Sequence, residues 1–180
     1  ELKISPLAFI AKVTADVLAE FPMLNSSLDP ELEKIVIKKY VNLGIAVDTP
    51  EGLIVPNIKN VQEKSIVNIA EEIAMLASAA KTRKLKLPDL KGSSFTISSL
   101  GAIGGKFFTP IINPPEVGIL GLSKTFPKVV AKNEGFESLE FLPLSLSYDH
   151  RVINGVYAAQ FITQLGAALG DTALMEKKFK

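Results

Sequence analysis

Residues 144–155 read Leu-Ser-Leu-Ser-Tyr-Asp-His-Arg-Val-Ile-Asn-Gly, and the neighbouring elements can be placed outward from this stretch. Its leucines and tyrosine alternate with serines, a period of two that indicates a strand with one apolar face. His150, the single histidine of the chain, follows near the end of that face, and an amphipathic helix begins after Asn154 and Gly155. A strand, a short polar turn that holds the imidazole, and a helix are therefore predicted.

The position of His150 suits acid–base chemistry. A side chain at a strand end can reach a cleft while its backbone is held rigidly. Between Asp149 and Arg151, an imidazole is well placed to act as a general base near neutral pH. Asp149 and Arg151 either form an ion pair that fixes the histidine loop or are solvated charges. A surface histidine in a polar turn is the competing interpretation, and spacing alone slightly favours it.

Helices and strands are interleaved irregularly along the rest of the chain. One helix is predicted from Ser5-Pro6, a capping hydroxyl followed by proline, until Pro22, and a second from a Ser65 cap through Ala80. Strands are predicted at 35–47 (one, or two broken near Gly44), 53–55, 95–98 and 117–122, and turns or loops at 25–30, 48–52 and 132–135. The expected fold class is a mixed two-layer α/β sandwich rather than a regular βαβ barrel.

Composition excludes several classes of function. The 180 residues are the size of one domain, 47% apolar, with a net charge of +1 and no basic tail, so nucleic acid is not an expected partner. Apolar runs are too short for a membrane span, so no membrane partner is expected either. Without cysteine and with one histidine, the chain has no thiolate nucleophile and no His-rich metal site, and no metal is predicted.

Two further segments carry candidate site residues. Ser98 ends a short strand, where a hydroxyl could donate to a developing oxyanion, although Ser-Ser before glycine is more often turn material. The loop that begins at Gly101 lacks the spacing of a P-loop or of a dinucleotide fingerprint, so its glycines are expected to allow close backbone approach or special dihedral angles. Residues 113–116, which begin with Asn113, form a rigid Asn-Pro-Pro-Glu corner that is better interpreted as a structural turn.

Several long motifs carry a resemblance to a known family. Residues 95–101 (Phe-Thr-Ile-Ser-Ser-Leu-Gly), 108–121 (Phe-Thr-Pro-Ile-Ile-Asn-Pro-Pro-Glu-Val-Gly-Ile-Leu-Gly), 144–155 and 38–56 closely resemble the catalytic domain of dihydrolipoyl acyltransferases, the E2 components of the 2-oxoacid dehydrogenase complexes. The resemblance implies a chloramphenicol-acetyltransferase-like sandwich with a mixed sheet, assembled as homotrimers with active sites between subunits. Residues 1–180 are then an acyltransferase catalytic domain that lacks the N-terminal arm and first strand usual in the family.

The same resemblance assigns roles to residues. It implies that His150 is the base and that Ser98, from the neighbouring subunit, is the hydroxyl that steadies the tetrahedral oxyanion. Many members have aspartate where this chain has Asn154, which cannot be an anionic partner of His150 but can still hydrogen-bond the loop. The residues expected to bind substrate or support the site are Asp149, Arg151, Gly101 and Asn113.

The function that the resemblance implies is acyl transfer between S-acyl-dihydrolipoamide and coenzyme A, by direct thiol attack and without an acyl-enzyme. The likeness of residues 144–155 to acetyltransferase members predicts acetyl transfer, as in pyruvate dehydrogenase. Coenzyme A is expected as substrate and the lipoyl group on a separate lipoyl domain.

E1 and E3 components are the other partners that the resemblance implies. Because residues 175–180 are largely polar, the sequence does not decide whether trimers assemble into a larger cubic core. The expected location is the bacterial cytoplasm or the mitochondrial matrix. Two alternatives are a non-catalytic core or E3-binding subunit and a free-standing O-acetyltransferase of a small molecule.

Overall fold

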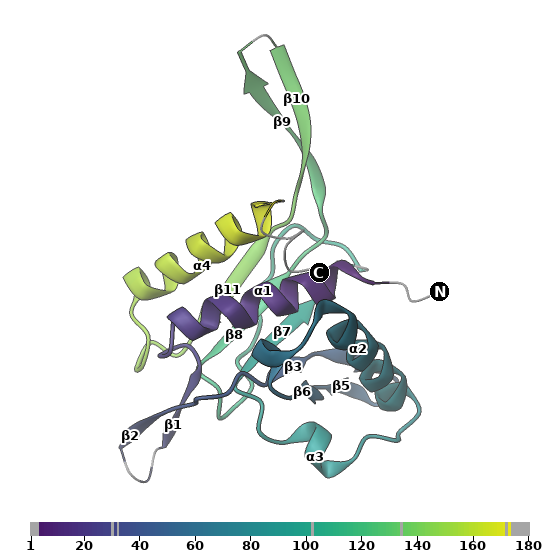
Figure 1. Ribbon diagram of the computed structural model, residues 1–180, viewed down its shortest axis with the longest axis vertical. Helices are drawn as coiled ribbons and strands as arrows, with labels where there is room; N and C mark the ends of the chain where they lie inside the picture. Colours follow the sequence, from purple (N-terminus) through teal and green to yellow (C-terminus); the bar gives the residue numbers. More distant parts are fainter. Residues whose placement is uncertain are drawn as a thin grey trace.

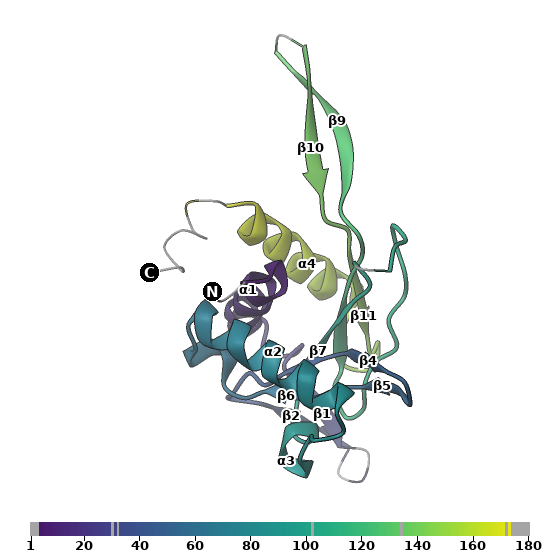
Figure 2. The same ribbon diagram turned by 90° about the vertical axis from the view of Figure 1, so that its right-hand side faces the viewer.

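The computed structural model describes residues 4–29, 31, 33–101, 103–133, 135–171 and 173, which form two layers and a projecting hairpin (Figure 1). The long helices α1 (Pro6–Glu20), α2 (Ile66–Lys81) and α4 (Gly155–Gly170) cover one side of a sheet (Figure 2). A short helix, α3 (Leu87–Leu90), and a 3₁₀ turn, η1 (Val61–Glu63), lie beside them. The predictions that concern residues 1–3, 30, 134 and 175–180 lie outside the described residues.

The central sheet is mixed. Its strand order is β11 (Leu144–Tyr148), β8 (Gly118–Leu122), β7 (Phe95–Ser99), β3 (Leu43–Ile45) and β6 (Asn57–Ile58). β7 runs parallel to β8 and β3, whereas the outer strands β11 and β6 run antiparallel to their neighbours. The predicted two-layer α/β sandwich is confirmed.

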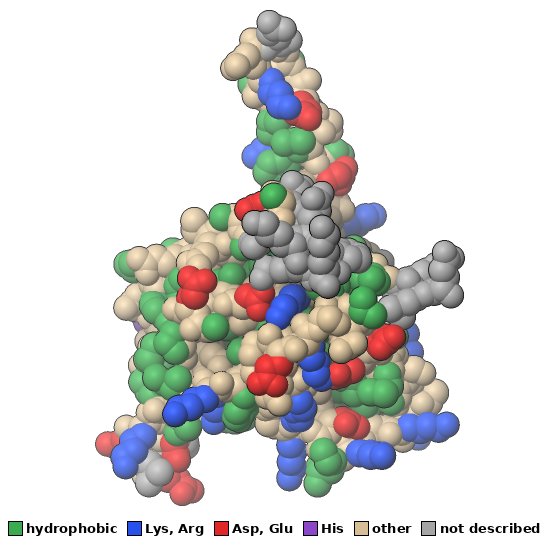
Figure 3. All heavy atoms as spheres, viewed as in Figure 1, with side chains coloured by type: hydrophobic (Ala, Val, Ile, Leu, Met, Phe, Trp, Pro, Cys, Tyr) green, Lys and Arg blue, Asp and Glu red, His purple; other side chains and the backbone are tan. Residues whose placement is uncertain are grey.

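Three hairpins extend from this framework. They are β1 (Ser26–Asp29) with β2 (Lys34–Ile37), β4 (Val47–Thr49) with β5 (Gly52–Ile54), and β9 (Phe126–Lys132) with β10 (Gly135–Phe141). The β9–β10 hairpin projects far beyond the two layers, and apolar side chains lie among charged ones on its surface (Figure 3). Because Phe136 is 82% exposed there, this hairpin gains little stability from the core.

Most predicted elements are confirmed, with local corrections. The Ser65 side chain caps α2 by accepting from the backbone N–H of Asn68, but Ser5 makes no such bond at the start of α1. Segment 25–30 was predicted as a loop, yet Ser26–Asp29 is strand β1, because backbone pairing with β2 outweighs the turn preference of its residues. Strands β9 and β10 were missed because their mostly exposed residues show no alternation of apolar and polar side chains.

The 35–47 segment, predicted as one strand or as two broken near Gly44, forms β2, β3 and the start of β4. Gly44 itself lies in the middle of β3, and the strands break at 38–42 and at Ala46. A Cβ at this position would lie 2.5 Å from Thr96 Oγ1 and 2.8 Å from Val55 Cγ1. Glycine is needed here because neighbouring side chains cross directly over the strand.

The helices bury one face of the sheet. Phe95 on β7 packs on Phe161 of α4 with ring centroids 5.9 Å apart, and Phe21, which follows α1, meets the same ring edge-on at 5.5 Å. Phe95 and Phe161 are fully buried, each contributing roughly 1.5–3 kcal/mol relative to an exposed position. This core fixes β7, β8 and β11, the strands that carry the candidate site residues.

Candidate active site

The turn that holds His150 is fixed by backbone hydrogen bonds. The N–H of Asp149 donates to the carbonyl of Val117 at 2.9 Å, and the Asp149 carbonyl accepts from Val152 at 3.0 Å and from Ile153 at 2.9 Å. His150 is exposed between β11 and α4, as the strand–turn–helix prediction requires. The imidazole is therefore accessible on a rigid backbone.

Tyr148, the last residue of β11, lies beside the imidazole. The two ring centroids are 5.6 Å apart, with an angle of 39° between the ring planes. Tyr148 is half-buried, so its ring limits the movement of His150 on one side. The sequence placed Tyr148 only on the apolar face of the strand. Its position two residues before His150 was a signal that the two side chains share that face.

Asp149 and Arg151 form the ion pair that was one of the two predicted alternatives. Arg151 Nε lies 3.0 and 3.1 Å from the two carboxylate oxygens, and Nη2 lies 2.6 Å from Oδ2. The hydrogen bonds from Arg151 are the main reason that the pKa of the Asp149 carboxyl is lowered. The ion pair therefore links the two residues on either side of His150.

Asn154 caps the helix that follows the histidine turn. Its side-chain oxygen accepts a hydrogen bond from the backbone N–H of Tyr157 at 2.9 Å. Asparagine and aspartate cap helices about equally well, so the departure from aspartate leaves this contact intact. The Asn154 side chain therefore bonds to the first turn of α4, whereas the sequence led us to expect a hydrogen bond to the histidine loop.

Ser98 lies on the face of the sheet opposite the helices. Phe95 and Ile97 point into the core, so Thr96 and Ser98 point to the other side of β7. The register pairs Ser98 with Gly121 of β8, and Gly121 with Ser145 of β11. Ser98 is partly exposed and is available to a ligand on that face.

The sheet register separates Ser98 from His150 within one chain. Ser98 is level with Ser145, whereas His150 follows Tyr148, three residues further along β11. Three residues of rise and two strand spacings separate the Cα atoms of Ser98 and Tyr148 by roughly 14 Å. The register therefore places Ser98 and the strand end that precedes His150 at different levels of the sheet.

Aromatic residues cover the sheet beside Ser98. A Cβ on Gly121 would lie 2.8 Å from Phe108 Cζ and 3.2 Å from Pro110 Cγ, so this pair packs directly on the glycine. A hollow of about 390 Å³ adjoins it, lined by Phe107, Phe108, Thr109, Ser145, Leu146 and Ser147. Sequence reasoning did not single out Phe108, because only the register places it next to Ser98.

The surroundings of Gly101 and Asn113 indicate structural roles for both residues. A Cβ on Gly101 would meet its nearest atoms at 3.7 Å, ordinary contact, so close backbone approach is not what requires glycine here. Gly104 and Gly105, with φ of 126° and 85°, do adopt the special dihedral angles expected of this loop. The Asn113 amide donates to the Glu116 carboxylate at 3.1 Å, which agrees with a structural corner.

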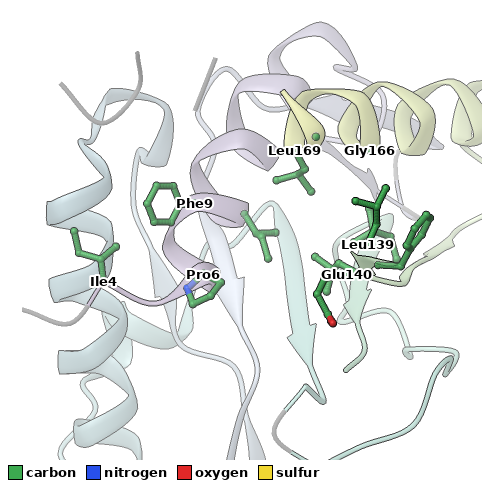
Figure 4. Close-up of a pocket in the computed structure, with 12 residues that line it drawn as sticks. Ile4, Pro6, Phe9, Leu139, Glu140, Gly166 and Leu169 are labelled. Carbon is green, nitrogen blue, oxygen red and sulfur yellow. The ribbon is translucent and has the colours of Figure 1, made fainter. Parts of the chain in front are cut away.

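A second hollow lies away from His150. It measures about 940 Å³ and is enclosed by the start of α1, the end of α4 and the segment that joins β10 to β11 (Figure 4). Its lining is largely apolar, with Phe9, Leu139 and Leu169 and one carboxylate, Glu140. His150, at the other end of β11 and α4, does not contribute to it.

Neither a metal-binding cluster nor a membrane-spanning helix is found among the described residues. They contain no group of three or more histidine, cysteine, aspartate or glutamate side chains that could hold a metal ion. None of the helices in that part of the chain combines the length and hydropathy needed to cross a membrane.

Comparison with known proteins decides the family. Residues 1–176 match the 2-oxoacid dehydrogenases acyltransferase (catalytic domain). The chain belongs to this family. This acyltransferase chain is 51% identical, over 93% of its length, to the dihydrolipoyllysine-residue acetyltransferase component of the pyruvate dehydrogenase complex of Buchnera aphidicola subsp. Acyrthosiphon pisum, and covers 42% of that protein. It is 51% identical over 94% of its length to the same component of Azotobacter vinelandii, covering 27%. The acyltransferase chain thus spans less than half of these relatives.

Solved structures agree with the family. The cubic core of the pyruvate dehydrogenase multienzyme complex superimposes with a TM-score of 0.92 at 49% identity, over 97% of the acyltransferase chain and 72% of that chain. The dihydrolipoamide acetyltransferase of Azotobacter vinelandii gives the same values. Chloramphenicol acetyltransferase, at 13% identity and a TM-score of 0.63 over 92% and 78% of the two chains, shares the fold. The predicted chloramphenicol-acetyltransferase-like sandwich is confirmed.

Proposed function

We propose that this domain transfers an acetyl group between S-acetyl-dihydrolipoamide and coenzyme A. The observation that carries the proposal is a shared spacing. In the Azotobacter vinelandii acetyltransferase, the roles in catalysis of a serine, a histidine 52 positions later and an asparagine four positions after that have been investigated. Ser98, His150 and Asn154 have the same spacing of 52 and four positions in a chain of the same fold.

The chemistry assigned to the residues is direct transfer. The His150 imidazole takes the proton of the attacking thiol, and the thiolate sulfur bonds to the thioester carbonyl carbon. Ser98 donates its hydroxyl hydrogen bond to the oxyanion of the tetrahedral species. That species collapses by breaking the bond to the other sulfur, which takes the proton back from the imidazolium. A positioned base contributes about 10²–10⁴-fold, and loss of one oxyanion donor costs about 10²–10³-fold.

The site is proposed to form between subunits of a homotrimer. Because the register places Ser98 roughly 14 Å from Tyr148, beyond which His150 lies, we infer that the serine comes from a neighbouring copy. Exposed apolar side chains on the segment that joins β7 to β8 support contact with another copy: Phe107 is 72% exposed and Ile111 is 90% exposed. The base of one subunit then faces the oxyanion donor of the next.

The wider partners follow from the relatives. We propose that the lipoyl group arrives on a separate lipoyl domain, that E1 and E3 components bind elsewhere on the complex, and that trimers can join into a larger core. The cubic core of a pyruvate dehydrogenase complex, at a TM-score of 0.92, supports the last point. The bacterial relatives support a cytoplasmic location over the mitochondrial matrix.

Steady-state transfer to dihydrolipoamide tests the reaction. Acetyl-CoA, succinyl-CoA and isobutyryl-CoA are supplied to wild-type protein, His150→Ala and Ser98→Ala, with Ser99→Ala as the matched hydroxyl control on the adjacent position. We expect acetyl preference, losses of about 10²-fold or more for the first two variants, and near-wild-type rates for the control. Preference for a bulkier acyl group would contradict acetyl transfer.

The same assay separates the alternatives. An inactive wild-type trimer would favour a non-catalytic core or E3-binding subunit. Transfer to a small alcohol but not to dihydrolipoamide would favour a free-standing O-acetyltransferase. Equal rates for wild-type protein and His150→Ala would mean that His150 is not the base.

A further inference from the structure

Glu116 ends the Asn-Pro-Pro-Glu corner and is buried, with 5% of its surface exposed. Its Oε1 accepts hydrogen bonds from the Ser93 hydroxyl and from the Asn113 amide, the latter at 3.1 Å. Its backbone N–H donates to the Asn113 carbonyl at 3.1 Å. Buried glutamates are ordinarily paired with a cation, and the side chains that influence the pKa of Glu116 are all uncharged.

The second carboxyl oxygen of Glu116 and a neighbouring hydroxyl are both unsatisfied. Oε2 is buried and makes no hydrogen bond within the described part of the chain, and the same holds for the Oγ1 of Thr96. Thr96 Oγ1 lies near enough to influence the pKa of the carboxyl, although the pair is outside hydrogen-bonding geometry. A proton on Oε2 would let it donate to Thr96 Oγ1, so that a small shift satisfies both atoms.

Burial favours the protonated form of the Glu116 carboxyl. Desolvation raises the pKa of Glu116 and is the largest influence on it, while the hydroxyls of Ser93 and Thr96 and the amide of Asn113 lower it. Oε2 is sealed from solvent by the described residues of one chain.

The elements packed around Glu116 lead to both halves of the active site. Ser93 lies just before β7, and Thr96 lies on β7, two residues before Ser98. Val117, the next residue after Glu116, holds the histidine turn by accepting the N–H of Asp149 at 2.9 Å. The backbone of Glu116 also bridges to Ser27 of β1.

We propose that Glu116 is a positioning residue of the acyltransferase site, whose buried, hydrogen-bonded carboxyl fastens the strand that carries Ser98 to the segment that holds the His150 turn. This role rests on the proposed function. Since Ser98 and His150 of one chain serve different sites of the trimer, each Glu116 positions the oxyanion donor of one site and the base of another.

Two substitutions separate the contribution of the Glu116 side chain's shape and hydrogen bonds from that of its acidity. Glu116→Gln keeps the shape, stays uncharged at every pH and can donate to Thr96, whereas Glu116→Ala removes every contact. Glu71→Gln, an exposed position on α2, is the matched control. The measurements are kcat and KM for acetyl transfer at neutral pH, and Tm of each trimer from acid to neutral pH.

We expect Glu116→Ala to lose about 10²-fold in kcat with little change in KM, since both halves of the site shift, and Glu116→Gln to restore most of that loss. The Tm of Glu116→Gln should rise relative to wild type as the pH increases. Burial raises the pKa of the folded carboxyl, so above about pH 4.3 the unfolded chain releases this proton before the folded chain does. Wild-type stability therefore falls as the pH rises until the folded carboxyl also ionises, and the glutamine variant lacks this dependence.

Three results would overturn the inference: glutamine and alanine variants that are equally impaired, a Tm difference that does not change with pH, or an alanine variant with wild-type kcat. If Glu116→Ala does not fold, the glutamine variant and its Tm still decide. An inactive wild-type protein would refute the proposed function alone, because the pH dependence of Tm does not require activity.

Discussion

Ser98 is level with Ser145 across the sheet, whereas His150 follows Tyr148 at the far end of the same outer strand. The proposed oxyanion donor and the proposed base of one chain therefore lie at different levels of the sheet. This separation gives the proposed trimer a catalytic reason, because a complete site needs one residue from each of two copies.

Mixed trimers test that relationship directly. Ser98→Ala and His150→Ala homotrimers should each be nearly inactive, but co-refolding them in equal amounts should restore about a quarter of wild-type activity, the fraction of sites that receive both intact residues. The measurement is the rate of acetyl transfer after mixing. Mixtures that stay as inactive as their parents, in trimers shown to have exchanged, would place both residues of a site in one chain.

Arg151 protects the histidine turn against acid. Its hydrogen bonds lower the pKa of Asp149, so the pair adds stability above the ordinary carboxyl pKa, and this stability is lost as the pH falls through the lowered value. Arg151→Gln should therefore move acid unfolding to higher pH, monitored by circular dichroism. Lys132→Gln, which disrupts an ion pair on the β9–β10 hairpin, is the control and should leave the midpoint in place.

Asn154 should tolerate aspartate but not alanine. Alanine removes the acceptor for the N–H of Tyr157 and should destabilise the folded chain by about 1 kcal/mol, while aspartate keeps the cap. Thermal unfolding of both variants beside wild type gives the comparison. If aspartate were as destabilising as alanine, a role beyond capping would be required.

Phe108 should limit the size of the acyl group. Its ring packs on Gly121, the register partner of Ser98, so Phe108→Ala opens space beside the proposed oxyanion donor. We expect kcat/KM for isobutyryl-CoA to rise relative to that for acetyl-CoA. Phe107→Ala, at an exposed neighbouring ring, is the matched control, and an unchanged ratio in Phe108→Ala would remove Phe108 from the acyl site.

Local features of the fold could be predicted well where periodicity was strong. The α1 and α2 helices and the β7, β8 and β11 strands follow from apolar spacing. The β9–β10 hairpin could not be found in this way, because its exposed residues carry no burial pattern. The strand β1 was hidden by turn-forming residues that only its pairing with β2 overrides.

The candidate site was predicted in parts. The order strand, turn and helix around His150 came from residues 144–155, and the Asp149–Arg151 pair was one of two open alternatives. The capping bond of Asn154, the ring of Tyr148 beside the imidazole and the packing of Phe108 on Gly121 were not predicted, because each depends on where side chains meet after folding.

By itself, the sequence determined the class of fold, the imidazole at a strand end and the set of motifs that identifies the family, since these are properties of local spacing. Only the tertiary structure decided that Ser98 and His150 are apart in one chain, because strand order and register are set by contacts between distant segments. The burial of Glu116 was decided at the same level: a carboxyl becomes isolated from water only when the core closes around it.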